Sequence, residues 1–293
     1  MTPSLPKNAP KVWQDLDQAA LDRAYDQTQW ASNIADVMGR CAARSQALRD
    51  KRGLPQRLAY GGGAREQLDF FSSGQAAAPL MVFVHGGAWR SGAAQDYAFV
   101  AGPWLDAGVH VAVLDFDAVQ DAGGELLALA AQVRAAVLWL QARAAQLGVD
   151  AQQLHLTGHS SGAHLAAAVA TGDAQGWPPL SLRSLGCVSG MYELEPVRRS
   201  GRSRYVAFSE ESVQRLSPAR QAAHLACPAL VAHGSLESPQ FKWQAQAWAQ
   251  ALGEAGKTVQ SLVMPGLNHF EILEALGQAE HPLTRAMLAL ARG

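Results

Sequence analysis

One pentapeptide of this chain, Gly158-His159-Ser160-Ser161-Gly162, has the residue types and spacing of a nucleophile elbow. Apolar residues before it predict a short buried strand over residues 154–157, and those after it predict a buried helix over residues 163–170. A strand that turns sharply into a helix at this pattern holds its serine on a strained backbone. The flanking glycines fit because a Cβ would collide where the two elements nearly touch. Ser160 is therefore the predicted nucleophile.

A second motif could stabilise the oxyanion that such a serine creates. A nucleophilic serine needs a base, a group that orients the base, and donors for the developing negative charge. His85-Gly86-Gly87-Ala88-Trp89 follows a buried apolar run, and its consecutive glycines let backbone N–H groups approach a substrate oxygen closely. We predict donors at Gly87 and Ser161, with Gly86 assisting. The alternative is an ordinary glycine turn.

The base and the acid are predicted from their places after the last two strands of the chain. In mostly parallel sheets, ligands bind beyond the C-terminal ends of the strands. His269 follows the last predicted strand, in a loop that enters a helix. Glu237 is the only carboxylate in the loop after the preceding strand, and it lies between Ser160 and His269 in chain order. A loop glutamate is ordinarily a solvated charge, so its position alone supports this role.

The other histidines and acids fit these roles less well. His159 and His164 flank the serine five residues apart, which is not the one-face spacing of a helical metal pair, and no third ligand is evident. We therefore predict no metal site. The acids that fall at less suitable places are Asp173, Glu210 and Glu211.

Composition restricts the class of protein. A length of 293 residues, a net charge of −1 and a hydrophobic fraction of 48% suit one large α/β domain, and the near-zero charge argues against nucleic-acid or membrane-surface partners. Cys41, Cys187 and Cys227 form no close pair, so neither disulfides nor a zinc site are expected. We see no signal peptide and no run of about 18 apolar residues, so we expect a soluble cytoplasmic protein.

The elements that position these residues are predicted from apolar periodicity. Residues 1–55 read as a helical lead segment, packed over the main domain. Strands are predicted at residues 67–70, 80–84, 109–115, 153–157, 182–188, 229–233 and 259–264, and helices at 125–147, 163–171 and 240–252. Such alternation predicts one domain, with a mostly parallel sheet and helices on both faces. Residues 192–220 interrupt it and are predicted as a small insertion near the edge of the sheet, close to the active site.

Together these motifs resemble those of the α/β-hydrolase fold, specifically the arylformamidase (kynurenine formamidase) group near the hormone-sensitive-lipase-like esterases. The likeness runs from about residue 60 to the end, with a weaker match at residues 21–25. The segments that carry it are residues 60–61, 68–71, 85–89, 189–196, 216–218, 238–241 and 268–270. Two departures stand out. Glu237 replaces the usual aspartate, and Phe116-Asp117-Ala118-Val119-Gln120 replaces a Tyr-Asp-Leu-x-Pro loop, which bears on substrate preference.

The resemblance implies a Ser-His-Glu hydrolase that converts N-formyl-L-kynurenine to L-kynurenine and formate, a step of tryptophan catabolism. It implies a small-molecule substrate and no cofactor, and it allows a homodimer. Trp89, Tyr192 and Phe270 are candidate aromatic walls of the substrate pocket or, alternatively, core residues. Arg90 and the arginines within residues 198–204 are candidates for the amino-acid end of the substrate.

Two other functions remain open from the sequence. A carboxylesterase or amidase acting on short acyl or aryl substrates would use the same residues, and only the pocket would differ. A non-catalytic binding protein of the same fold would be expected to lose the serine or histidine, and both are present here. Comparing turnover of a formamide with that of a nitrophenyl ester distinguishes a formamidase from a carboxylesterase or amidase. Organophosphate labelling of Ser160 tests the non-catalytic alternative.

Overall fold

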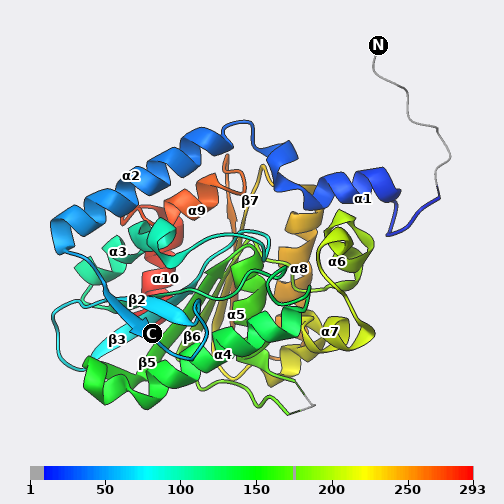
Figure 1. Cartoon of the computed structure of the whole chain (residues 1–293). Coiled ribbons are helices and arrows are strands. Elements are labelled where there is room, and N and C mark those ends of the chain that lie inside the picture. The colour runs from blue at the N-terminus through cyan, green and yellow to red at the C-terminus, as the bar shows by residue number, and fades with distance from the viewer. Residues whose placement is uncertain (1–9, 174–175, 293) are drawn as a thin grey trace.

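The computed structural model describes residues 10–173 and 176–292, which build an eight-stranded sheet (Figure 1). Its strands lie in the order β1-β2-β4-β3-β5-β6-β7-β8. Pairing is antiparallel from β1 through β2 to β4 and parallel across the rest. The strands are β1 Gln56–Ala59, β2 Gln67–Phe71, β3 Ala78–Val84, β4 His110–Leu114, β5 Val149–His159, β6 Ser184–Val188, β7 Ala229–Gly234 and β8 Val259–Met264. The predicted mostly parallel α/β fold class is confirmed.

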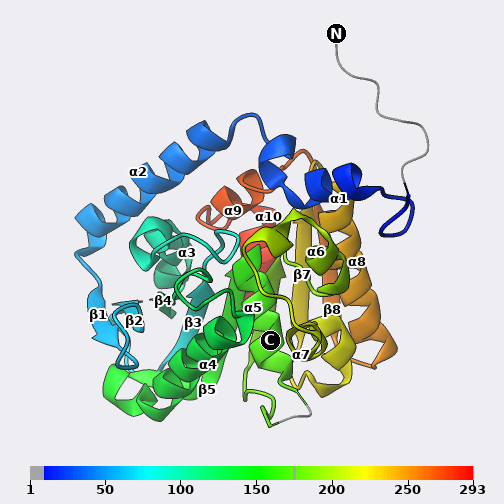
Figure 2. The ribbon, with the colours of Figure 1, turned by 45° about the vertical axis from the view of Figure 1, so that its right-hand side comes forward.

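Helices connect the parallel strands and cover both faces of the sheet (Figures 1 and 2). The α-helices are α1 Gln18–Tyr25, α2 Ile34–Arg52, α3 Ala101–Asp106, α4 Leu126–Ala142, α5 Ser161–Thr171, α6 Glu195–Arg199, α7 Glu210–Arg215, α8 Pro239–Glu254, α9 Glu271–Ala275 and α10 Pro282–Arg292. The 3₁₀ helices are η1 Gln27–Trp30, η2 Ala94–Val100, η3 Ala144–Leu147, η4 Gly201–Arg204 and η5 Pro218–His224.

Strand β3 shows why the sheet is covered on both sides. Successive side chains of a strand point to opposite faces. Leu80, Val82 and Val84 belong to a core cluster that includes residues of α4, α5 and α8. Met81 and Phe83 belong to a second cluster, with residues of α3 and α10. A strand buried on both faces reads as a continuous apolar run, which is why the sequence marks β3 so clearly.

The segment before β1 forms α1, η1 and α2, and ion pairs attach α2 to α9. Arg40 donates to both carboxylate oxygens of Glu274, at 2.9 and 2.7 Å, and Arg44 lies 3.3 Å from the same carboxylate. The hydrogen bond from Arg40 holds the pKa of Glu274 below its usual value, so this carboxylate is charged at neutral pH. These contacts fix α2 beside the C-terminal part of the chain (Figure 1).

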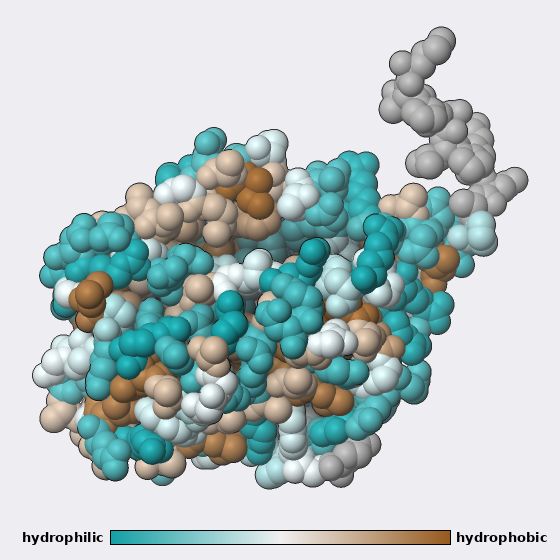
Figure 3. Space-filling view, in the orientation of Figure 1, coloured by the Kyte–Doolittle hydropathy of each residue, from teal (hydrophilic) through white to brown (hydrophobic). Residues whose placement is uncertain are grey.

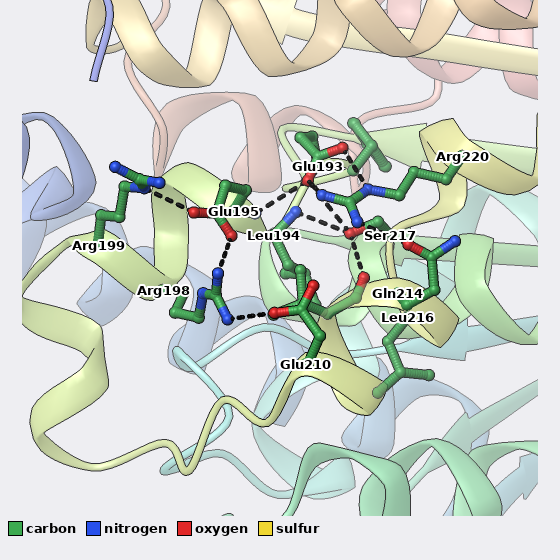
Figure 4. A network of polar contacts seen from close by, with 12 residues as sticks. Glu193, Leu194, Glu195, Arg198, Arg199, Glu210, Gln214, Leu216, Ser217 and Arg220 are labelled. Carbon is green, nitrogen blue, oxygen red and sulfur yellow. Dashed lines mark hydrogen bonds and ion pairs between the residues drawn. The ribbon is translucent and has the colours of Figure 1, made fainter. Parts of the chain in front are cut away.

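Residues 192–220, predicted as a small insertion near the edge of the sheet, form the connection from β6 to β7, and β7 neighbours the edge strand β8. Charged pairs hold this insertion together (Figure 4): Arg220 binds Glu193 through two hydrogen bonds, and Arg198 pairs with Glu195 and Glu210.

Hydrophobic side chains on the surface are scattered. On the face shown in Figure 3, hydrophilic residues predominate and the hydrophobic ones form separate small patches. Among the described residues, the exposed large hydrophobic side chains come from different parts of the fold: Leu54, Leu138, Leu236 and Val263. Within these same residues, no helix is both long and apolar enough to cross a membrane.

Candidate active site

Ser160 lies at the turn between β5, which ends at His159, and α5, which begins at Ser161. Its backbone has φ +56° and ψ −125°, a conformation that costs free energy for a residue other than glycine. The turn is held by the backbone N–H of Ser160, which donates to the carbonyl of Val188 in the neighbouring strand at 2.9 Å. The side chain is thereby presented at the C-terminal end of the sheet.

Close packing around Gly162 maintains this turn. A Cβ at Gly162 would lie 2.1 Å from the carbonyl oxygen of Val84 and 2.3 Å from that of His85. Both atoms belong to the backbone at the end of β3, so they cannot rotate away as a side chain could. The start of α5 therefore approaches β3 only because residue 162 has no side chain.

We expect Gly162→Ala to lower the free energy of unfolding by about 2–3 kcal/mol, because the added methyl group must push backbone atoms apart. Urea unfolding followed by circular dichroism measures the change. Gly39→Ala in α2 is the matched control, since a methyl group there meets no atom within 4 Å. Alanine is the better helix former, so the control should keep or raise stability. A Gly162→Ala protein as stable as wild type would contradict the packing argument.

The structure brings together the three residues predicted as nucleophile, base and acid. Nε2 of His269 lies 2.9 Å from Oγ of Ser160, and Nδ1 of His269 lies 2.8 Å from Oε2 of Glu237. The three side chains come from the loops that follow β5, β7 and β8, which all end at the same edge of the sheet. All three are buried. The continuous hydrogen-bonded chain lets His269 take a proton from Ser160 while Glu237 fixes the ring.

Glu237 is held as an ionised carboxylate. Its Oε1 accepts hydrogen bonds from Oγ of Ser189, at 2.6 Å, and from the backbone N–H of Gly234, at 2.7 Å. Burial opposes ionisation, but the charge and hydrogen bond of His269 and these two donors together hold the pKa of Glu237 below its usual value. Sequence reasoning did not give Ser189 a role. Ser189 could have been found from its position directly after β6, because polar residues at the C-terminal ends of the parallel strands face the site.

His159 supports the base through its backbone. The ring Nε2 of His159 lies 2.9 Å from the carbonyl oxygen of His269, so this nitrogen carries the proton and donates it. Burial, together with the charge of His269, lowers the pKa of His159 well below its usual value, so the ring is neutral. His159 therefore positions the loop of His269 without adding charge beside it.

The glycine loop after β3 lies against the serine. A Cβ at Gly86 would lie 3.1 Å from the Cβ of Ser160, so the loop backbone passes directly beside the nucleophile. The N–H of Trp89 donates to Oγ of Ser161 at 3.2 Å, which attaches the loop to the elbow. Gly86 and Gly87 line the same cavity as Ser160. This placement suits the predicted oxyanion donors at Gly86, Gly87 and Ser161, since the last begins α5 and has no helical partner for its N–H.

Ser160 and His269 open into a cavity of about 760 Å³. One wall is apolar and combines the lead segment with the loop after β8, through Ile34, Met38 and Phe270. Charged residues form much of the rest, and they come from α1, the glycine loop and η4: Asp22, Asp26, Arg90, Arg202 and Arg204. The contribution of residues 22–38 was not predicted, because no motif there points to chemistry.

Of the three aromatic residues predicted as pocket walls, only Phe270 lines the cavity. Trp89 and Tyr192 take the alternative role that the sequence left open, because both rings lie in the core. The Trp89 Nε1–H donates to Nδ1 of His164 at 3.2 Å, and Tyr192 stacks on Trp248 with ring centroids 5.7 Å apart. The altered loop at residues 116–120 is also set back, since Phe116 stacks on His85 behind the glycine loop.

The arrangement has the parts that acyl transfer requires. A hydroxyl nucleophile touches an imidazole, a buried carboxylate orients that imidazole, and backbone N–H groups lie beside the hydroxyl. Over residues 10–173 and 176–292, no cluster of three or more His, Cys, Asp or Glu side chains could hold a metal ion. The residues in contact can carry out attack, proton transfer and leaving-group release by themselves.

Comparison with known proteins places this chain among hydrolases. The model of the prolyl oligopeptidase family matches residues 128–286, more than half of the chain, and a model named BD-FAE matches residues 68–176. A kynurenine formamidase from Salmo salar is 28% identical, and the match covers 95% of this chain and 98% of that protein.

Solved structures extend the likeness to the fold. A provisionally assigned thioesterase from Silicibacter sp. TM1040 has a TM-score of 0.80 and 25% identity, covering 92% of this chain and 98% of that one. Esterase B from Lactobacillus rhamnosis has a TM-score of 0.67 at 19% identity, covering 91% of this chain and 96% of its own. The predicted α/β-hydrolase fold and the resemblance to arylformamidases and esterases are confirmed.

Proposed function

Because this chain belongs to the prolyl oligopeptidase family and is a serine hydrolase of the α/β-hydrolase fold, we propose that it hydrolyses aryl formamides, N-formyl-L-kynurenine in particular. The observation that carries the proposal is the extent of the similarity to a kynurenine formamidase. That match takes in 95% of the chain, whereas the family model begins at residue 128. It therefore takes in most of the segment whose residues 22–38 line the cavity.

In the proposed mechanism, Ser160 attacks the formyl carbon while His269 accepts the hydroxyl proton. Glu237 keeps the ring oriented and offsets its positive charge. The backbone N–H groups of Gly87 and Ser161, with Gly86, hold the oxyanion of the tetrahedral intermediate. His269 then gives its proton to the departing aniline nitrogen, and the C–N bond breaks.

A formyl ester on Ser160 remains after the amine has left. Water attacks this ester with His269 as base, the serine oxygen leaves and regains its proton, and formate is released. With N-formyl-L-kynurenine the other product is L-kynurenine, and this reaction is a step in tryptophan breakdown. The small size of the formyl group fits a nucleophile held close against the glycine loop, where Gly86 lies beside Ser160.

A substrate panel tests the proposal. We expect the wild-type enzyme to hydrolyse N-formyl-L-kynurenine with a higher kcat/KM than 4-nitrophenyl acetate or the N-acetyl analogue of the same amine. The absorbance of the free aniline measures cleavage of the two amides, the absorbance of 4-nitrophenolate measures cleavage of the ester, and the Ser160→Ala protein supplies the blank. Efficient cleavage of the ester with no cleavage of the formamide would assign the enzyme to the carboxylesterases instead.

A further inference from the structure

One arginine of the insertion differs from all the others in that segment. Arg202 lies in η4, lines the cavity that contains Ser160, and is only 8% exposed. Every other arginine within residues 192–220 has a carboxylate partner, as Figure 4 shows for three of them. These pairs are Arg198 with Glu195 and Glu210, Arg199 with Glu195, Arg204 with Asp22, Arg215 with Asp173 and Glu211, and Arg220 with Glu193.

Neutral groups alone hold the guanidinium of Arg202. Its Nη1 donates to the hydroxyl of Tyr205 at 2.9 Å, and its Nη2 donates to the carbonyl of Tyr25 at 2.8 Å. Its Cζ lies 5.5 Å from the centre of the Trp89 ring, within the range of a cation–π contact. No carboxylate of the described residues lies within 4.0 Å, and the buried Nε has no hydrogen-bond partner among them.

These contacts leave donors to spare. A guanidinium carries five N–H groups, and the two hydrogen bonds account for two of them. A buried cation without a counter-ion is costly, so such a group is expected where an anionic ligand completes it. Arg90 lines the same cavity and adds a second cation, with its Cζ 4.5 Å from the centre of the Tyr205 ring. This side of the cavity is therefore suited to an anion.

We propose that Arg202 binds a carboxylate of the substrate, so that the preferred substrates are aryl formamides with a carboxylate remote from the formyl group. This inference rests on the proposed formamide hydrolysis at the same cavity. A guanidinium is planar, and the geometry of its paired N–H groups matches a carboxylate. Tyr205 and Tyr25 hold the guanidinium in place before the substrate arrives, which lowers the entropy lost on binding.

The test compares two substrates that differ in one group. N-formyl-L-kynurenine carries the carboxylate, and N-formylkynuramine keeps the formamide, ketone and amine but lacks it. We expect Arg202→Gln to lower kcat/KM for the first substrate by about 10- to 100-fold, mainly through KM, because a charge-assisted hydrogen-bond pair is lost. For the second substrate we expect a change within about threefold. Arg202→Lys keeps the charge but not the paired donors, so its loss of kcat/KM should again be confined to N-formyl-L-kynurenine and should be smaller than that of Arg202→Gln.

Arg198→Gln is the matched control, because it removes an arginine of the same insertion that pairs with Glu195 and Glu210 and does not line the cavity. It should lower kcat/KM only slightly, and equally for both substrates. Equal losses for the two substrates in a folded Arg202 variant would overturn the inference and leave Arg202 as a structural link to Tyr25. If Arg202→Gln does not fold, the lysine variant alone decides between these outcomes.

Failure of the proposed function is recognised separately. A wild-type enzyme that cleaves esters but neither formamide would refute formamide hydrolysis. The role of Arg202 is then measured with O-acetyl-L-tyrosine and O-acetyltyramine, a pair of aryl esters that again differ only in the carboxylate. A selective loss for O-acetyl-L-tyrosine in Arg202→Gln would support the inference, and an equal loss for both esters would overturn it.

Discussion

Replacing Ser160 by alanine is expected to lower kcat for the formamide by about 10⁵- to 10⁶-fold, because it removes the hydroxyl that contacts His269 and would form the acyl intermediate. Alanine keeps the Cβ, so the contact between Gly86 and residue 160 should persist and the protein should fold normally. Single-turnover measurements at high enzyme concentration measure the remaining rate. An organophosphate should label the wild-type protein at Ser160 and leave the variant unlabelled.

Ser161→Ala is the control for this experiment. Ser161 is the neighbouring serine, but its Oγ accepts a hydrogen bond from the N–H of Trp89 and contacts no member of the triad. Its loss should lower kcat by about tenfold at most, since one neutral hydrogen bond is removed. Full activity of Ser160→Ala, or labelling at another residue, would show that the nucleophile lies elsewhere. A folded wild-type protein that no organophosphate labels would favour the non-catalytic function.

Glu237→Gln should have the second-largest effect, a fall in kcat of about 10³- to 10⁴-fold. The reason lies in the donors around Oε1. Ser189 and the N–H of Gly234 both donate to this atom, so the oxygen of a glutamine will stay there and its NH₂ group will face His269. The ring must then accept at Nδ1 and carry its proton on Nε2, which prevents it from taking the proton of Ser160.

The lowered pKa of Glu237 also bears on the pH dependence of the wild-type enzyme. A carboxylate whose pKa is lowered by folding stabilises the native state above its unfolded pKa of 4.5, and this contribution is lost only as the pH falls through the lower folded value. The orienting charge is therefore constant from pH 5 to 8, so titration of Glu237 should add no inflection to the pH–rate profile of the wild-type enzyme over that range. A pH–rate profile of kcat measures it.

Glu274→Gln is the control for Glu237→Gln, because Glu274 is also a buried glutamate with a lowered pKa but pairs with Arg40 and Arg44 away from the cavity. It should lower stability modestly and leave kcat within about twofold of wild type. A Glu237→Gln enzyme that keeps a tenth or more of wild-type kcat would contradict the role assigned to Glu237 and direct attention to another acid.

Much of the fold could be predicted because the central strands carry unambiguous patterns. β3 and β4 are buried along almost their whole lengths and read as apolar runs. β1 was missed because its four residues are largely exposed and have no alternation to detect. The start of β5 was placed too late for the same reason, since Asp150, Ala151 and Gln152 lack a buried side.

Some residues of the site could likewise be predicted from the sequence, and others could not. Ser160, Glu237 and His269 could be selected because each lies in the turn or loop that follows a strand, and chain position alone gives that information. Trp89 and Tyr192 could not be assigned to either role, because the pattern of a sequence does not say whether an aromatic ring faces a cavity or the core. Arg202 is distinguished only by a missing partner. Such a feature emerges when the partners of neighbouring arginines are known in three dimensions.

The lead segment that lines the cavity has a consequence for how this enzyme can change. Residues 22–38 reach the cavity yet supply neither nucleophile, base nor acid, and the residues that do all lie after position 150. Part of the cavity wall is thus supplied by a stretch of the chain that is separate from the triad. Substitutions in this lead segment can reshape that part of the wall while Ser160, Glu237 and His269 stay unchanged.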